Sequence, residues 1–325
     1  MKLSSNENPF PPLPSVVRAA ADAAERLPLY PDATAAQLTA LLAGRLDVAP
    51  EQICWGAGSV SVLMHLLTAI CSPGDEVVHP WRSFEAYPLA VAVAGATAVP
   101  VPLLPDGRHD LDAMLDAVTP RTRAVLVCSP NNPTGPTLRH DDVRRLQEAL
   151  PGDVALVIDE AYIEFARATE LPRSMELLDD PRVVVLRTLS KAWGLAGFRV
   201  GYGIADAGLI RGIRTVTPPF SVSVPAQAAA KAVLEEEAAV TERVETIVAE
   251  RDRVADALRG LGLTVPDAQG NFVWLPTGNS TAWAEHFAHN GLIVRDYAPD
   301  GIRITIGMPE VNDRVIDAAS RLPRG

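Results

Sequence analysis

Short apolar runs alternate with amphipathic stretches along the first two thirds of the chain. Runs such as "DEVVHP", "TAVPVPL", "RAVLVCSP", "DVALVIDEAY" and "RVVVLRTLSK" are rich in β-branched residues and end in turn or polar residues, which is typical of buried strands. Stretches between them, such as "DDVRRLQEAL" and "AYPLAVAVAGA", have the pattern of helices. Strands that are apolar throughout and alternate with helices predict an α/β domain with a mostly parallel sheet covered on both faces.

The two ends of the chain have a different pattern. Residues 1–29 are rich in Pro and Asn and then helical, and "TAAQLTALLAGRL" predicts a helix that stops at Gly44. Residues 226–260 are almost entirely helical, with charge runs that we interpret as a solvated face. The segments "NFVWLP", "TAWAEHFAHNG", "LIVRDY" and "GIRITIG", with a last helix, predict a small α+β unit. We therefore expect a large domain over 30–232 and a small domain made of 1–29 and 233–325.

Composition and charge disfavour several classes of function for this protein. The 325 residues are 48% hydrophobic, which is ample for a large core. The net charge of −11 disfavours nucleic acid or an anionic membrane as a partner. The three cysteines form no CxxC pair and the six histidines no HExxH motif, so we expect neither a disulfide framework nor a metal site. No apolar stretch has the length of a signal peptide or membrane span, which predicts a cytoplasmic protein.

Polar side chains follow several of the predicted strands. Parallel sheets bind ligands outside the carboxyl ends of their strands. There, "SPNNPTG" places Asn132, "DEAY" places Asp159 and Tyr162, and "RTLSK" places Thr188, Ser190 and Lys191. Each residue alone has a structural explanation: a surface lysine, a helix cap, a core aromatic. In this order, each at a strand end, they indicate one ligand site.

The residue types suggest what that ligand is. A lysine amine with a lowered pKa forms Schiff bases with carbonyls. The glycine turn "GAGSVS" into a helix offers backbone N–H groups to a phosphate, and Arg199 adds a bidentate grip. A carboxylate can hold a protonated ring nitrogen, while an amide and a phenol can donate to a ring oxygen. Pyridoxal 5′-phosphate needs all of these groups.

Four motifs carry a resemblance to a known family. "SPNNPTG", "DEAY", "TLSKAWGLAGFRVGYG" and "GIRITIG" resemble those of fold-type I pyridoxal-phosphate aminotransferases. More closely they resemble the histidinol-phosphate aminotransferase branch, which includes aromatic amino acid aminotransferases. The resemblance extends over nearly the whole chain. It implies the fold-type I transferase architecture, with a mostly parallel seven-stranded sheet between helices and a smaller α+β domain, and it implies a homodimer.

The resemblance also implies roles for matching residues. Lys191 would be the Schiff-base lysine and proton carrier, and Asp159 the partner of the pyridine nitrogen. Asn132 and Tyr162 would contact the 3-oxygen, and Phe84 would stack on the ring. The phosphate would be held by Arg199, Ser190, Thr188, the backbone of Gly58, Ser59 and Val60, and Tyr30 of the neighbouring subunit. On the substrate side, Arg303 would clamp the α-carboxylate, with Arg295, Asn6 and Glu7 nearby.

The implied reaction is a two-stage transamination with a 2-oxo acid such as 2-oxoglutarate, and the substrate is the open question. Where many histidinol-phosphate aminotransferases carry a "PTY"-like stretch, this chain has "WRSFEAYP". That departure, with the apolar "PPF" at 218–220, favours an aromatic amino acid. Arg82 could instead hold a substrate phosphate, so histidinol phosphate is the alternative. A decarboxylase of an amino-acid phosphate ranks third, since "GLAGFR" resembles the aminotransferase version better.

Two rival functions come from outside this family of enzymes. A non-enzymatic regulator built on the same fold would carry an added basic DNA-binding segment, against which the short N-terminus and acidic charge argue. A Schiff-base lyase that needs no pyridoxal phosphate would be a colourless protein, unchanged when the cofactor is added.

Overall fold

Seven strands form one sheet in the order β1-β7-β6-β5-β4-β2-β3. We describe a computed structural model covering residues 1–322. Strand β7 runs antiparallel to both of its neighbours, while the remaining adjacent pairs are parallel. The strands are β1 (Ile53–Gly56), β2 (Glu76–Trp81), β3 (Thr97–Pro102), β4 (Thr122–Cys128), β5 (Ala155–Asp159), β6 (Val183–Thr188) and β7 (Gly201–Ala205). The predicted mostly parallel seven-stranded sheet is confirmed.

Both faces of the central strands are buried. In β4, Val125 and Val127 belong to one apolar cluster, whereas Ala124 and Leu126 belong to another. Residues of β5 and β6 alternate in the same way, because successive side chains point to opposite faces of a sheet. Helices α3 (Ser59–Ile70), α4 (Ala86–Val93) and α7 (Ala207–Val216) supply residues to the second cluster. This double burial explains the uninterrupted apolar runs in these strands.

Helices α2 (Ala36–Leu46), α5 (Leu111–Asp116), α6 (His140–Ala149) and α8 (Val224–Glu235) contribute to the first cluster. The expected end of α2 at Gly44 is wrong, since the helix continues to Leu46. It ends where Asp47 takes a left-handed conformation, with φ of 55°, a geometry that commonly closes helices. Gly44 therefore lies inside the last turn of the helix.

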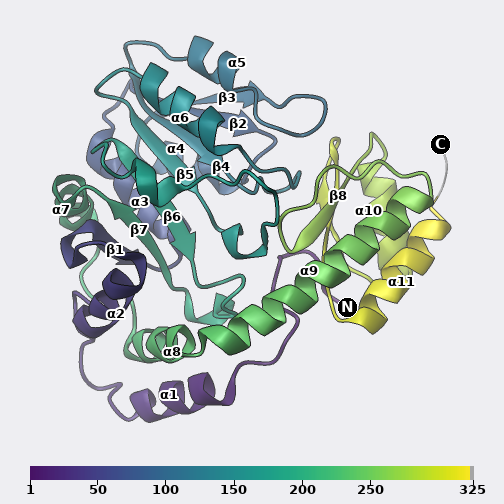
Figure 1. Cartoon of the computed structure of the whole chain (residues 1–325), viewed down its shortest axis with the longest axis horizontal. Coiled ribbons are helices and arrows are strands. Elements are labelled where there is room, and N and C mark those ends of the chain that lie inside the picture. The colour runs from purple at the N-terminus through teal and green to yellow at the C-terminus, as the bar shows by residue number, and fades with distance from the viewer. Residues whose placement is uncertain (323–325) are drawn as a thin grey trace.

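A second, smaller sheet lies at the other end of the molecule. Its strands β8 (Phe272–Pro276), β10 (Gly301–Thr305) and β9 (Arg295–Tyr297) are antiparallel, with β10 in the centre. Helices α10 (Ser280–His289) and α11 (Pro309–Ser320) lie on this unit, and α9 (Glu237–Gly260) runs to it from the end of α8 (Figure 1). The predicted α+β unit is thus present, while its limits remain a prediction.

The N-terminal segment connects the two parts. Leu3 exchanges backbone hydrogen bonds with the small unit: its N–H donates to Ile293 at 2.7 Å, and its carbonyl accepts from Thr305 at 2.9 Å. The chain then passes to α1 (Pro14–Ala24), which packs against α8 (Figure 1). Residues 4–8 consequently pass between the small sheet and the carboxyl edge of the large one.

Across residues 1–322, no helix is both long enough and apolar enough to span a bilayer.

Candidate functional site

One pocket lies at the carboxyl ends of β4, β5 and β6, beside the start of α3. It brings together every residue that the sequence predicted for the cofactor, except Tyr30, and adds Cys128 and Ala161. The lining residues are Gly58, Ser59, Val60, Phe84, Cys128, Asn132, Asp159, Ala161, Tyr162, Thr188, Ser190, Lys191 and Arg199.

Lys191 stands three residues beyond the end of β6. Its Nζ donates to the Ser5 carbonyl oxygen at 3.0 Å, so the N-terminal segment contacts the amine directly. Burial lowers the pKa of Lys191 to about 8, and the positive charge of Arg303 acts in the same direction. Near neutral pH about a tenth of the amine is therefore unprotonated, far more than for an ordinary lysine, and this is the form that a nucleophile or base requires.

Asp159 is the last residue of β5 and is buried. Its Oδ2 accepts from the Tyr87 hydroxyl at 3.0 Å and its Oδ1 from the Ala161 N–H at 3.2 Å. Burial raises the pKa of Asp159 to about 6, while these two hydrogen bonds oppose the rise. The carboxyl group is thus ionised at neutral pH and suited to a protonated ring nitrogen.

Tyr162 and Asn132 lie on the side of the pocket nearest the small sheet. The Asn6 side chain donates to the Tyr162 hydroxyl at 2.9 Å, and burial raises the pKa of Tyr162, so its phenol stays protonated. The Asn132 Oδ1 accepts from the Arg303 guanidinium, which leaves its amide N–H groups to donate elsewhere. Both residues can supply a hydrogen bond to a ligand oxygen.

Close backbone packing shapes the opposite end of the pocket. Gly58 caps α3 with φ of +88°, and a Cβ there would lie 2.5 Å from Arg199 Nη2. A Cβ on Gly201 would lie 2.2 Å from the Ser59 nitrogen, so both positions require glycine. The Arg199 Nη1 donates to Ser190 Oγ at 3.3 Å. First-turn N–H groups of α3, which lack helical acceptors, thus lie beside an exposed guanidinium.

These groups form a donor set that fits pyridoxal phosphate. The helix N-terminus and Arg199 suit a phosphate, Asp159 suits a pyridine nitrogen, and the amine of Lys191 suits an aldehyde. The pocket lies at the carboxyl edge of the sheet, where the order of chemistry-bearing strands predicted it.

Arg303 occupies the centre of β10 and is only 5% exposed. Its Nη1 donates to Asn132 Oδ1 and to the Tyr297 hydroxyl, the latter at 2.9 Å, and its Nη2 donates to the Ser4 carbonyl at 2.7 Å. Among residues 1–322, its Nε has no hydrogen-bond partner. Arg303 is not itself one of the residues that line the pocket, but its hydrogen bond to Asn132 places this buried guanidinium next to one that is.

Two other predicted arginines are paired with carboxylates. Arg82 Nε lies 2.5 Å from Asp300 Oδ2, and its guanidinium lies 4.5 Å from the centre of the Trp81 ring. Arg295 is exposed and pairs with Glu85 at 2.9 Å. Neither residue is among those that line the pocket.

Asn6 and Glu7, the two N-terminal residues predicted on the substrate side, differ in burial and in their partners. Asn6 is fully buried, and besides holding Tyr162 it accepts from Thr305 Oγ1 at 3.1 Å. Glu7 is exposed and pairs with Lys2 at 2.8 Å. Asn6 therefore fixes a pocket side chain, whereas Glu7 lies at the outer surface.

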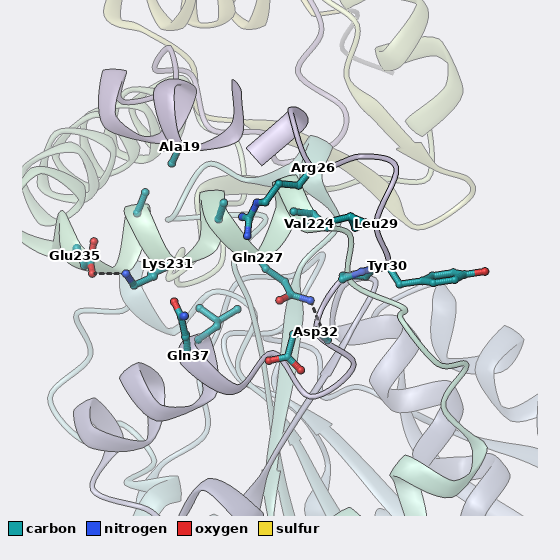
Figure 2. A pocket seen from close by; sticks show the side chains of 14 residues that line it. Ala19, Arg26, Leu29, Tyr30, Asp32, Gln37, Val224, Gln227, Lys231 and Glu235 are labelled. Atoms are coloured by element: carbon teal, nitrogen blue, oxygen red, sulfur yellow. Dashed lines mark hydrogen bonds and ion pairs between the residues drawn. The ribbon is translucent and has the colours of Figure 1, made fainter. Parts of the chain in front are cut away.

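Tyr30 lies away from this pocket. It borders a separate hollow between α1, α2 and α8, and its ring extends away from the other residues there (Figure 2). The side chain is 82% exposed and stacks on Phe220, with ring centres 4.7 Å apart. Within one chain Tyr30 is not near the phosphate-binding end of the pocket, so its assigned role depends on a second subunit.

Sequence reasoning missed several residues of the site. Tyr297 was not selected. The Ser4 and Ser5 carbonyls were not selected either, because every residue has a backbone carbonyl and the residue type does not show which of them is used. Tyr87 stands three residues after Phe84 in "SFEAY", and helical spacing could have suggested that it shares a face with Phe84. Cys128 could have been noticed as the last residue of its strand.

Known proteins share both the sequence and the shape of this chain. The family described as aminotransferase class I and II matches residues 1–318. An aromatic amino acid aminotransferase of Streptomyces coelicolor is 49% identical, with 96% of this chain and 88% of the relative covered. One from Cutibacterium acnes is 46% identical, with 100% and 93% covered. A histidinol-phosphate aminotransferase of Sinorhizobium meliloti, solved in complex with pyridoxal 5′-phosphate, is 30% identical with a TM-score of 0.91, covering 99% and 90%.

Proposed function

The chain belongs to the aminotransferase class I and II family, and we propose that it binds pyridoxal 5′-phosphate and transfers the amino group of an aromatic L-amino acid to a 2-oxo acid such as 2-oxoglutarate. The observation that carries the proposal is the single pocket in which Lys191, Asp159, Asn132, Tyr162 and Arg199 meet. Relatives named aromatic amino acid aminotransferase, at 46–49% identity over nearly the full chain, support the substrate class.

Different residues of the pocket hold different parts of the cofactor. When bound, pyridoxal phosphate supplies a reactive aldehyde and an electron-withdrawing ring. Arg199, Ser190 and the first turn of α3 hold its phosphate, and Asp159 keeps its ring nitrogen protonated. Asn132 and Tyr162 donate to its ring oxygen.

The chain's own groups also handle the proton and the substrate. Lys191, whose pKa is lowered to about 8 by burial, takes a proton from the reacting carbon as the free amine and gives it back as the ammonium. Arg303 binds the α-carboxylate of the amino acid through its fork of N–H groups. The Ser4 and Ser5 carbonyls, which accept from Arg303 and Lys191, keep both side chains at the mouth of the pocket.

The pairing of Arg82 favours a substrate without a phosphate. A phosphate-binding site needs an available cation, but Asp300 neutralises Arg82 and Glu85 neutralises Arg295. The aromatic rings of Trp81 and Tyr297 lie next to Arg82. This arrangement is better suited to an aromatic side chain than to histidinol phosphate.

A half-reaction tests this function. The holoenzyme is mixed separately with L-phenylalanine, L-histidinol phosphate and L-glutamate, and the visible absorbance of its cofactor is followed. We expect rapid loss of that absorbance with phenylalanine and glutamate and a slow response to histidinol phosphate. A fast response to histidinol phosphate alone would replace the aromatic assignment, and absence of any cofactor uptake would remove the whole proposal.

We further propose a homodimer formed through the surface around Tyr30. Apolar side chains are exposed there: Leu27 is 64% exposed, Leu29 66% and Phe220 40%. Large exposed apolar residues that gather in one region are typical of interaction surfaces. A second copy of the chain would cover them and bring its Tyr30 to the exposed Arg199 end of the pocket.

A further inference from the structure

A buried tyrosine, Tyr87, contacts Asp159 from behind the pocket. Its hydroxyl donates to Asp159 Oδ2 at 3.0 Å, although it is not one of the residues that line the pocket. Tyr87 is 1% exposed and Asp159 4%. The hydrogen bond is therefore shielded from water, where a bond to a charged acceptor is strong.

The fold fixes this contact from both sides. Asp159 continues the alternation of β5, in which Ala155 and Val157 face the cluster containing α3 and α4. Tyr87 lies in the first turn of α4, within that cluster. Its ring meets Phe84 edge to face, with ring centres 5.7 Å apart and planes at 82°. The tyrosine ring is thus held on the side to which the carboxylate points.

We propose that Tyr87 is a positioning residue for the cofactor: its hydroxyl holds the Asp159 carboxylate in place, and in its ionised form, for the pyridine nitrogen. This inference rests on the proposed function, because it assigns Asp159 to a bound pyridoxal phosphate. It extends that function by one residue outside the pocket.

Three other ionisable groups near Asp159 do not hold its carboxylate in place. Cys128 faces it from β4, Glu160 follows it in the chain, and Lys191 approaches from the segment after β6. Burial raises the pKa of the Cys128 thiol to about 12, so the thiol is neutral. Among residues 1–322, Tyr87 is the one side chain that donates a hydrogen bond to Asp159.

Ionisation of Asp159 depends on that donor. Burial raises the pKa of Asp159 to about 6, and the Tyr87 hydrogen bond is the largest influence that lowers it. Burial and the neighbouring carboxylate hold the pKa of Tyr87 well above its usual value, so the phenol remains a donor at every working pH. Without the hydroxyl, Asp159 would take up a proton at higher pH.

The test is the pH dependence of pyridoxal phosphate affinity, measured by equilibrium dialysis on wild type and Tyr87→Phe. The substitution removes the hydroxyl and keeps the ring. We expect the affinity to fall on the acid side in both proteins. Protonation of Lys191 contributes equally to this fall in both, whereas the part due to Asp159 should have its midpoint about one pH unit higher in the variant, as for a lost hydrogen bond to a charged group. Tyr202→Phe is the matched control: it removes another buried hydroxyl, one that lies beside Arg187 rather than Asp159, and should leave the midpoint in place.

A second variant separates positioning from a general loss of stability. In an Asp159→Asn background there is no carboxylate to titrate, so Tyr87→Phe should cause no further change in the pH dependence. An unchanged midpoint in Tyr87→Phe, or an equal loss of affinity at every pH that persists in the Asp159→Asn background, would overturn the inference while leaving the proposed function intact. Wild-type protein that takes up no pyridoxal phosphate would overturn both.

Discussion

The side-chain amine of Lys191 donates to the carbonyl oxygen of Ser5 at 3.0 Å, although 186 positions of the chain separate the two residues. The neighbouring carbonyl, of Ser4, accepts from Arg303 at 2.7 Å. One short stretch of the N-terminal segment thus contacts both the lysine that follows β6 and the arginine of the small sheet. The chemistry of the site therefore depends on three segments that lie far apart in the sequence.

Replacing Lys191 by alanine should abolish turnover, because the amine that bonds to the cofactor and moves the proton is lost. The chain has only three lysines, at positions 2, 191 and 231. Borohydride reduction of the loaded wild-type protein, followed by peptide mass spectrometry, should mark Lys191 alone. A mark on Lys2 or Lys231, or substantial transamination by the alanine variant, would contradict the assignment.

The lowered pKa of Lys191 predicts how cofactor uptake depends on pH. Only the unprotonated amine reacts with an aldehyde, so the uptake rate should rise about tenfold per pH unit below pH 8 and level off above it. Stopped-flow absorbance measures this rate. Arg303→Met removes a positive charge that lowers the pKa of Lys191 and should shift the midpoint to higher pH. Arg295→Met, which removes a more distant guanidinium, should not shift it.

Much of this site could be predicted from residue types at strand ends. Asn132, Asp159 and Lys191 follow apolar runs, and the parallel topology brings the ends of those runs to one edge. The sequence of β7 does not by itself predict a strand, because "GYGIA" contains two glycines, which are uncommon inside strands. One of them, Gly201, is explained only in three dimensions, where a Cβ at that position would lie 2.2 Å from the Ser59 nitrogen.

What the sequence could not predict is how charges are paired. Arg82, Arg295 and Arg303 are the same residue type, yet the first two pair with carboxylates, whereas the Nε of the third has no partner within the described part of the chain. Their partners, Asp300 and Glu85, are 218 and 210 positions away. No local pattern encodes such distant pairs, so the contrast between the arginines emerges only from the fold.

Arg303→Lys should weaken amino-acid binding while the protein stays folded. Lysine keeps the charge but loses the planar fork that matches a carboxylate. The loss of a buried charged hydrogen-bonded pair typically costs roughly 2–5 kcal/mol, which here should raise KM for phenylalanine and glutamate at least tenfold. Arg295→Lys is the matched control, because Arg295 is exposed and lies on the neighbouring strand. Equal effects of the two substitutions would remove Arg303 from substrate binding.

Asp300→Asn should change substrate preference in one direction. Without the carboxylate, the guanidinium of Arg82 loses its partner at 2.5 Å and becomes available to an anion. Exposed ion pairs contribute up to about 1 kcal/mol, so we expect kcat/KM for histidinol phosphate to rise up to about fivefold, with little change for phenylalanine. Arg82→Gln in the same background should cancel the gain. An unchanged preference would show that Arg82 does not face the substrate.

Two substitutions at the surface around Tyr30 should separate dimer formation from cofactor binding. Phe220→Asp places a charge on the ring that Tyr30 stacks against, so it should produce monomers with weakened cofactor affinity. Tyr30→Phe keeps that stacking and loses only the hydroxyl, so it should leave the dimer intact and lower pyridoxal phosphate affinity several-fold, as for one lost hydrogen bond to a phosphate. Analytical ultracentrifugation gives the oligomeric state, and equilibrium dialysis gives the affinity.

A dimer whose cofactor affinity is unaffected by Tyr30→Phe would mean that the partner's hydroxyl does not reach the cofactor. A wild-type protein that sediments as a monomer and still binds pyridoxal phosphate tightly would mean that the pocket of one chain is sufficient.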